Sequence, residues 1–314
     1  MEIKDIADYF KKDKIFITPE AASILANNVD FLDKIREQCI KDNIFIITTD
    51  FLKNFFDQQN FSVKIEIPEE VREFSVEDVV LQLKNRLEFL SSVLIQNNQL
   101  KEVYSISRLV KAKKDFEKGT VIGMIKDKTT YTFTLEDLSG SIIVRGEAND
   151  IEKLNLDEVI GVELKKDGET FVVNKFFYPS FSFFRKIQKL SEDVIFSCEN
   201  FSFRGKNFDI KMNEGAKISI GDVKILLLKF NVFKSYAKGD YLESACLLLE
   251  KRHVNPTVHK IGKIYKDDFF LLKEIPEYFI IVGAAENLKK IYKGVQIYFL
   301  KEGSFLNLKE GRFL

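Results

Sequence analysis

The hydrophobic pattern of the chain changes its period near Gly119, and this change constrains the fold more than any other feature. Before Gly119, apolar residues recur at spacings of three and four, which indicates amphipathic helices. After it, the stretch TVIGMIKDKTTYTFTLEDLSGSIIVRGE alternates apolar and polar residues and contains a glycine suited to a tight turn. This stretch therefore predicts three consecutive strands.

Two further strands follow at once. The stretch DEVIGVELKKDGETFVVNKFF reads as a strand pair joined at Lys166-Asp167-Gly168, and NDIEKLNL between the third and fourth strands predicts a short helix. Five strands with a helix at this position are typical of a small OB-type barrel, a fold that does not by itself name a ligand.

The first sixty residues contain a loose internal repeat. IFITPEAASIL (15–25) and IFIITTDFLKNFF (44–56) each consist of a short apolar extended segment, a threonine and a helical pattern. Thr18 is placed to cap the first helix, with Pro19 in its first turn, and Thr48 or Thr49 to cap the second. We expect a small helical domain over residues 1–60.

Residues 61–102 predict a linker followed by one helix. The stretch FSVKIEIPEEVREF contains Pro68 and resembles a linker. The apolar stripe of the helix is formed by Val80, Leu83, Leu87, Leu90 and Leu94, and its charged residues Lys84, Arg86 and Glu88 are expected at the surface. A stripe this short favours packing onto a core over a coiled coil.

The remaining chain predicts two more domains. We expect the OB-type domain over residues 103–179 and a third domain, rich in strands with one helix at YLESACLLLEKRH, over 180–314. The fold class expected for the whole chain is therefore multidomain α+β.

Composition limits the classes of function. Lys+Arg and Asp+Glu number 48 each, so the formal charge is zero, whereas dedicated nucleic-acid binders usually carry a basic excess. Cys39, Cys198 and Cys246 are scattered and form no CxxC pair, which supports neither a zinc ribbon nor a disulfide framework. A charged N-terminus and the lack of a membrane-length apolar run favour a reduced intracellular compartment.

The motifs of familiar catalytic sites are missing from the sequence. It contains no P-loop, no GxGxxG after a strand and no GxSxG. His253 and His259 are the two histidines, and Asp267 and Asp268 are the carboxylates nearest to them downstream. A metal site needs three or more ligands, so structural roles for both histidines are the favoured interpretation.

An aromatic cluster at the end of the predicted barrel is open to two interpretations. Its members and the basic residues that follow are Phe176, Phe177, Tyr178, Phe181, Phe183, Phe184, Arg185 and Lys186. Aromatic rings flanked by cations stack on single-stranded nucleic acid, but a cluster dominated by phenylalanine in a neutral chain more often seals a domain seam or contacts a partner. We favour the seam or partner.

Two shorter stretches carry weaker signals. The basic run RLVKAKKDFEKG (108–119) is expected to be a solvated face. TTDFLKNFF (48–56) ends like a peptide that binds a sliding clamp, but it lacks the leading glutamine and is better interpreted as a buried helix, so a clamp contact is the least favoured expectation.

Several motifs occur in an order that resembles a known family. These are FITPEAASIL, NRLEFLSSVLIQNNQL, VIGMI, LEDLSGSIIV, LLLEKRHVNPT and KEIPEYFIIVG. The series resembles the B-subunit family of DNA polymerases, and most of all the small subunit of archaeal family D DNA polymerase, over about residues 1–175 and 215–314. The resemblance implies a helical domain, an OB domain and a calcineurin-like phosphoesterase domain, which resembles a metal-dependent 3′–5′ exonuclease in archaeal members and is inactive in eukaryotic ones.

The chain departs from the family at the positions of the metal ligands. Cys198 and Asn200 stand where the resemblance places an Asp and a His, LLLKFNVF stands where it places Tyr-His-Gly, and YFIIVGAAEN retains only Gly283 of Gly-His-x-His. The segment between Pro179 and Ile220 is also short for the first half of a phosphoesterase core. Arg252, His253 and Pro256 are retained, and the resemblance implies that they are a structural marker.

We therefore expect a non-catalytic accessory subunit of a replicative DNA polymerase, with no cofactor, that docks a large catalytic subunit and meets DNA through the complex. The alternatives are a surviving 3′–5′ exonuclease and a stand-alone OB-fold protein that binds single-stranded DNA. The expected location is cytoplasmic in an archaeon, or nuclear in a eukaryote, with no membrane contact.

Overall fold

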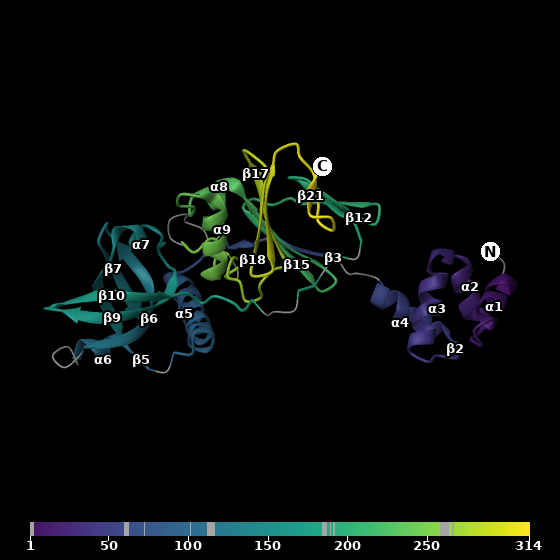
Figure 1. Cartoon of the computed structure of the whole chain (residues 1–314), viewed down its shortest axis with the longest axis horizontal. Helices are drawn as coiled ribbons and strands as arrows, with labels where there is room; N and C mark the ends of the chain where they lie inside the picture. The colour runs from purple at the N-terminus through teal and green to yellow at the C-terminus, as the bar shows by residue number, and fades with distance from the viewer. Residues whose placement is uncertain are drawn as a thin grey trace. The chain divides into compact units, whose positions relative to one another are not determined.

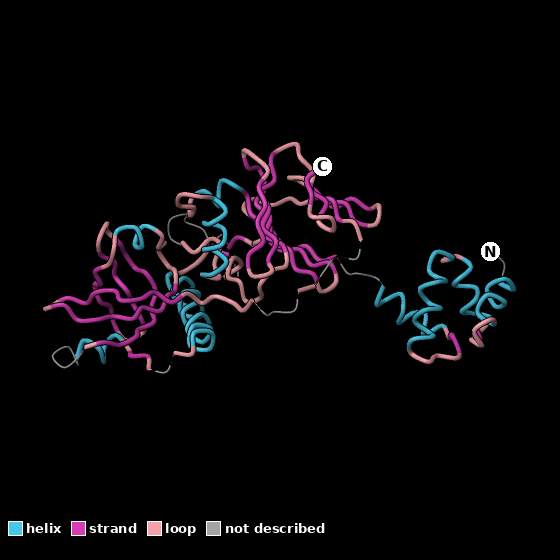
Figure 2. Tube along the Cα trace, viewed as in Figure 1, coloured by secondary structure: helices cyan, strands magenta, loops and turns pink. Residues whose placement is uncertain are grey.

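The computed structural model describes residues 3–59, 63–71, 73–100, 102–111, 117–183, 187–188, 190, 192–257, 264–265 and 267–314. The chain divides into two compact units, Met1–Val63 and Lys64–Leu314 (Figure 1). The first is helical and the second is rich in strands, so the coarse expectation of a multidomain α+β protein holds (Figure 2). The finer domain limits stay a prediction. No described helix combines the length and the apolar character needed to cross a membrane.

The N-terminal unit packs helices around two short strands. Its elements are α1 (Ile3–Lys11), β1 (Phe16–Ile17), α2 (Pro19–Ala26), the 3-10 helix η1 (Val29–Phe31), α3 (Leu32–Lys41), β2 (Ile46–Ile47) and α4 (Thr49–Gln59). β1 and β2 pair in parallel, so the two halves of the sequence repeat lie side by side. Thr18 accepts a hydrogen bond from the Ala21 N–H, and Thr48 accepts one from the Phe51 N–H. The repeat and both threonine caps are confirmed.

A closed barrel occupies the middle of the chain. Its elements are β5 (Val103–Tyr104), α6 (Ile106–Lys111), β6 (Lys118–Lys128), β7 (Thr132–Asp137), β8 (Gly140–Arg145), α7 (Ala148–Glu152), β9 (Val159–Asp167) and β10 (Thr170–Phe177). The strands pair in the order β6-β7-β8-β10-β9, and β9 pairs back with β6. β8 and β10 are parallel. Gly168 has a φ of 59° in the β9–β10 turn, a conformation that glycine adopts without strain. The five strands and the short helix were therefore predicted correctly.

The long helix α5 (Val76–Asn98) packs only its second half on the barrel. Ser75 and Asp78 form a capping box at its start, and Leu87, Leu90 and Leu94 are buried against barrel residues. Val80, the first residue of the predicted stripe, is 57% exposed. The prediction that Arg86 lies at the surface was wrong: Arg86 is 1% exposed, because ionic and carbonyl partners from later in the chain surround its guanidinium.

The described C-terminal part combines a six-stranded sheet, a five-stranded sheet and a two-stranded sheet, and two helices cover one face of the six-stranded sheet. Its elements are β3 (Val63–Glu66), β4 (Glu70–Val71), β11 (Val194–Phe196), β12 (Asn200–Phe203), β13 (Lys206–Asp209), β14 (Gly215–Ile220), β15 (Val223–Lys229), α8 (Phe230–Lys234), α9 (Tyr241–Glu250), β16 (Ile264–Tyr265), β17 (Tyr278–Ala284), β18 (Leu288–Tyr292), β19 (Val295–Lys301), β20 (Leu306–Asn307) and β21 (Arg312–Phe313).

The larger sheet has the order β18-β19-β17-β15-β14-β3, and β15, β17 and β19 run parallel. α8 and α9 cover one of its faces, where Phe299 packs with Phe233 and Leu248 (Figure 1). Tyr298 points to the opposite face and contacts Phe313 of the smaller sheet, whose order is β13-β12-β11-β20-β21.

Two segments differ from their sequence-based expectation. Residues 63–66, expected in a linker, form β3 and extend the larger sheet beside β14, while β4 pairs with β16. The third domain was expected to contain one helix, but residues 230–234 form a second, α8, because Phe230 and Phe233 pack on β19 beneath the helical layer. Tertiary packing overrides the local strand pattern in the second case.

We predict that Thr18→Ala lowers the free energy of unfolding of the N-terminal unit by about 1 kcal/mol, because the Ala21 N–H loses its capping oxygen. Urea unfolding followed by far-ultraviolet circular dichroism measures the change. Thr18→Ser keeps the hydroxyl and is the matched control. Equal stabilities of Thr18→Ala and Thr18→Ser would contradict the assigned cap.

Candidate functional site

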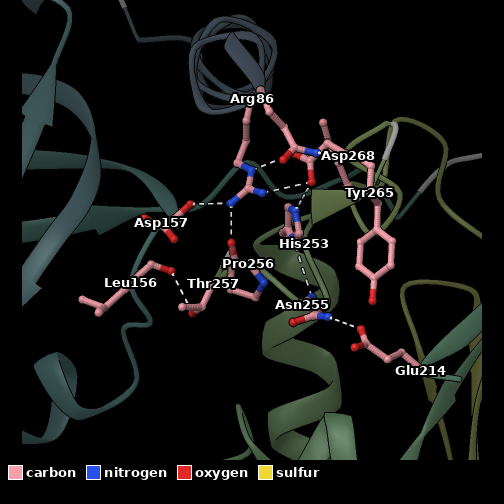
Figure 3. Close-up of polar contacts among 12 residues, drawn as sticks. Arg86, Leu156, Asp157, Glu214, His253, Asn255, Pro256, Thr257, Tyr265 and Asp268 are labelled. Carbon is pink, nitrogen blue, oxygen red and sulfur yellow. Dashed lines mark hydrogen bonds and ion pairs between the residues drawn. The ribbon is translucent and has the colours of Figure 1, made fainter. Parts of the chain in front are cut away.

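The predicted marker residues lie where α9 ends and the chain meets α5 and the barrel (Figure 3). Arg252 follows α9 in the left-handed conformation, with a φ of 54°, and its Nε donates to the Ser180 carbonyl at 2.9 Å. His253 and Pro256 come directly after this turn. The two marker residues therefore face the interior of the protein, where they meet residues from α5.

Arg86 and Asp268 form the centre of this cluster. The Arg86 Nε donates to Asp268 Oδ2 at 2.6 Å and its Nη2 donates to Oδ1 at 2.9 Å, a bidentate pair. Its Nη1 donates to the carbonyl oxygens of Asp157 at 3.0 Å and Pro256 at 2.6 Å. One guanidinium thus joins α5, the barrel and two segments of the α/β part, as Figure 3 shows.

His253 completes the cluster with both of its ring nitrogens. Nε2 lies 2.8 Å from Asp268 Oδ1, and Nδ1 accepts a hydrogen bond from the Asn255 N–H at 3.2 Å. Because Nδ1 accepts a hydrogen bond and Nε2 faces a carboxylate, the neutral imidazole is the tautomer that carries its proton on Nε2. The imidazole is 2% exposed, so it is held in place on all sides.

Burial and charge set the protonation states of this cluster. Burial, reinforced by the Arg86 charge, lowers the pKa of His253 to about 4. Burial alone would raise the pKa of Asp268, but the neighbouring His253 and Arg86 lower it below its usual range. Because the imidazole is neutral at pH 7, Arg86 is the cation that keeps Asp268 ionised there.

A second chain of hydrogen bonds continues from Asn255. Its Nδ2 donates to Glu214 Oε2 at 2.9 Å, and its Oδ1 accepts from the Tyr236 hydroxyl at 2.5 Å. Burial is also the main reason why the pKa of Tyr236 is raised. These bonds fix the loop after α9 to the start of β14.

A buried ion pair lies beside the cluster. The Lys251 ammonium is 2.7 Å from Glu158 Oε2, and both side chains are 1% exposed. Glu158 also accepts hydrogen bonds from the backbone N–H and the side chain of Asn155, at 2.8 and 2.7 Å. Burial lowers the pKa of Lys251 while Glu158 opposes that shift. The pair therefore joins the end of α9 to the barrel at a second point.

The chemistry open to the cluster follows from its hydrogen bonds. Both oxygens of Asp268 and both nitrogens of His253 are already engaged, and Arg86 occupies the position where a cation would sit. Among the described residues, no three His, Cys, Asp or Glu side chains are grouped so that they could hold a metal ion. His259 lies outside the described residues. Sequence reasoning named His253 and Asp268 but missed Arg86, whose position on a charged helix face gave no signal.

The aromatic cluster is divided among three cores. Phe176 and Tyr178 pack against the barrel core, Phe177 packs with the α5 leucines, and Phe181 is 6% exposed in the α/β core. Phe183 is 64% exposed, and the Lys293 ammonium lies 5.1 Å from its ring centre. Phe184, Arg185 and Lys186 lie outside the described residues. The buried Phe181 cannot offer its ring to DNA or a partner, whereas Phe183 can.

Three segments that the polymerase resemblance assigns to metal-ligand positions meet at one cavity. This cavity of about 650 Å³ is lined by residues 198–200 after β11, residues 229–231 after β15, and Val282 and Gly283 of β17. Gly283 has a φ of 81° at a break in the β17–β19 pairing. Parallel α/β sheets place their ligand sites at the carboxyl ends of their strands, which is where this cavity lies. In the three segments that line this cavity, the side chains include Cys198, Asn200 and Asn231. Burial raises the pKa of the Cys198 thiol.

Comparison with known proteins gives no family for the chain. No family model matches it, and no curated protein matches it with significant similarity.

We predict that stability falls as the pH is lowered from about 6.5 to about 4. The folded-state pKa of His253 lies below its value in the unfolded chain, so the unfolded state binds the extra proton first in this window. The shift corresponds to about 3 kcal/mol of unfolding free energy at most. Asp268 acts in the same direction only at more acidic pH.

Urea unfolding at a series of pH values measures this effect. His253→Gln keeps a donor for Asp268 but does not titrate, so its stability profile should be flatter between pH 6.5 and 4. Parallel profiles for the two proteins would show that His253 is not the group responsible.

We predict that Lys251→Met lowers the unfolding free energy by about 3 kcal/mol, because Glu158 is left buried without its cation. Adding Glu158→Gln should recover most of the loss, since the amide carries no charge and still accepts from the Asn155 N–H. Thermal unfolding of the single and double variants measures the recovery. A double variant no more stable than Lys251→Met would contradict the pairing.

Proposed function

We propose that the chain is a non-catalytic accessory subunit of a replicative DNA polymerase, of the archaeal family D type. The order of its sequence motifs resembles that of the B-subunit family, and a helical unit, a barrel and an α/β part are compatible with the organisation that this resemblance implies. In this role the barrel and the α/β part together bind a large catalytic subunit.

The observation that carries the proposal is the convergence of three separate segments at the 650 Å³ cavity. The resemblance assigns each of them to the metal site of a phosphoesterase. Two of them lie side by side because β15 and β17 pair in parallel, and the segment after β11 joins them at the same cavity. At these positions the chain carries Cys198, Asn200 and Asn231, whereas a dinuclear phosphoesterase uses several His, Asp and Asn ligands. A remnant of a phosphoesterase site accounts for both facts.

The barrel supports the same proposal. Its pairing order, with β9 returning to β6 and with β8 parallel to β10, agrees with the five-stranded Greek-key barrel of OB folds. The retained marker His253 fits a structural role, because it is buried and holds the Arg86–Asp268 pair. DNA contact is delegated to the complex in this proposal, in keeping with the zero formal charge.

We predict that the full chain co-purifies with a family D large subunit when the two are co-expressed. The exposed Phe183 and the exposed Ile291 on the edge strand β18 are the apolar contacts that we assign to this interface. Phe183→Ser and Ile291→Glu should each reduce the recovered large subunit. Phe45→Ser, which changes a 63% exposed ring of the N-terminal unit, is the matched control.

Two results would overturn the proposal. One is a stable monomer that ignores the large subunit in the same pull-down. The other is manganese-dependent removal of 3′-terminal nucleotides from single-stranded DNA by the purified chain, lost in the variant Asn200→Ala, which would establish a surviving nuclease.

A further inference from the structure

A second cavity lies along one face of α5, and its lining residues differ from those of the 650 Å³ cavity at the ends of β15 and β17. It has a volume of about 960 Å³ and lies between α5, the segment of β3 and β4, and the β14–β15 hairpin. The α5 residues that line it are Asp78, Leu81, Gln82, Asn85, Arg86 and Phe89, which recur every three or four positions and so share one helix face. We call this cavity the α5 groove.

Apolar side chains are exposed in the α5 groove. Ile67 is 40% exposed, Phe74 is 39% exposed and Leu81 is 55% exposed, and all three line it. Val76 and Val80, on the same half of α5, are 73% and 57% exposed. Large apolar side chains gathered in this way commonly mark an interaction site on a protein surface. The barrel covers only the second half of the helix, so this half is available to a partner.

The charges around the groove favour a cationic occupant. The lining includes the carboxylates Glu66, Glu69, Asp78, Asp267, Asp268 and Glu274 and the cations Arg86, Lys217, Lys224 and Lys273, six against four, a net charge of −2. Arg86 and Lys224 are already paired with Asp268 and Glu274. Glu70, Glu73 and Glu77 are close in sequence to the lining residues, as is Arg72, and Glu66 is paired with Lys64. The phosphates of a nucleic acid are repelled by such a surface, whereas Lys and Arg side chains are attracted.

We propose that the α5 groove binds a basic amphipathic helical segment of a partner protein. Its apolar residues pack on Ile67, Phe74 and Leu81, and its Lys or Arg residues face the acidic rim. This is the helix-in-groove mode of peptide recognition. The inference does not depend on the polymerase proposal, because it rests on a different surface.

The test uses a fluorescent helical peptide built from leucine and lysine in an amphipathic pattern, and a second peptide with glutamate in place of lysine. Fluorescence polarisation with the full chain should show binding of the lysine peptide that weakens as salt is raised, and weak or no binding of the glutamate peptide. Leu81→Ser removes the apolar contact without adding a charge that would itself attract lysine, and it should weaken lysine-peptide binding by at least about tenfold. Glu66→Lys should also weaken it.

The matched control is Ile40→Ser, which makes the same apolar-to-polar change at a 53% exposed site on α3, outside the groove, and should bind the lysine peptide as the parent does. Circular dichroism confirms that each variant is folded. Hydrogen exchange should slow in the first half of α5 when the lysine peptide binds. The proposal is overturned if Leu81→Ser binds the lysine peptide as tightly as the parent, if the glutamate peptide binds equally well, or if the lysine peptide does not bind at all.

Discussion

The contact between Arg86 and Asp268 is the interaction on which the larger unit depends most. The guanidinium is fully buried and is satisfied by one carboxylate and two backbone carbonyls from three distant segments. Removing water from such a pair is costly, so it persists only when every donor and acceptor is matched. The matching requires α5, the barrel and the α/β part to adopt one mutual arrangement.

In this cluster a buried histidine holds neighbouring groups in place. His253 is neutral and is used at both nitrogens, which makes it an orienting group for Asp268. Lys251 and Glu158 form a second buried charge pair, which joins the end of α9 to the barrel. Together the two pairs connect the barrel, α5 and the α/β part within the larger unit.

The sequence predicted local features well and long-range features poorly. The barrel strands, the threonine caps and the helix at 241–250 follow from short-range periodicity and turn residues, which act through nearest neighbours. Arg86 was placed at the surface because a helix pattern does not reveal partners 182 positions away. For the same reason residues 63–66 read as a linker, although they complete a sheet whose other strands come much later. The meeting of residues 198–200, 229–231 and 282–283 at one cavity was not predicted, since no pattern in a single segment shows that separate segments converge.

The position of β3 has a consequence for synthesis of the protein. β3, β4 and α5 leave the ribosome early, yet their partners β14, β16 and Asp268 belong to the last third of the chain. Until those partners emerge, the nascent chain must carry an unpaired strand edge and a helix with an uncovered face. Contacts between such distant segments form slowly and leave apolar surface open to aggregation meanwhile. Shortened chains that end before β14 should therefore depend on chaperones to stay in solution.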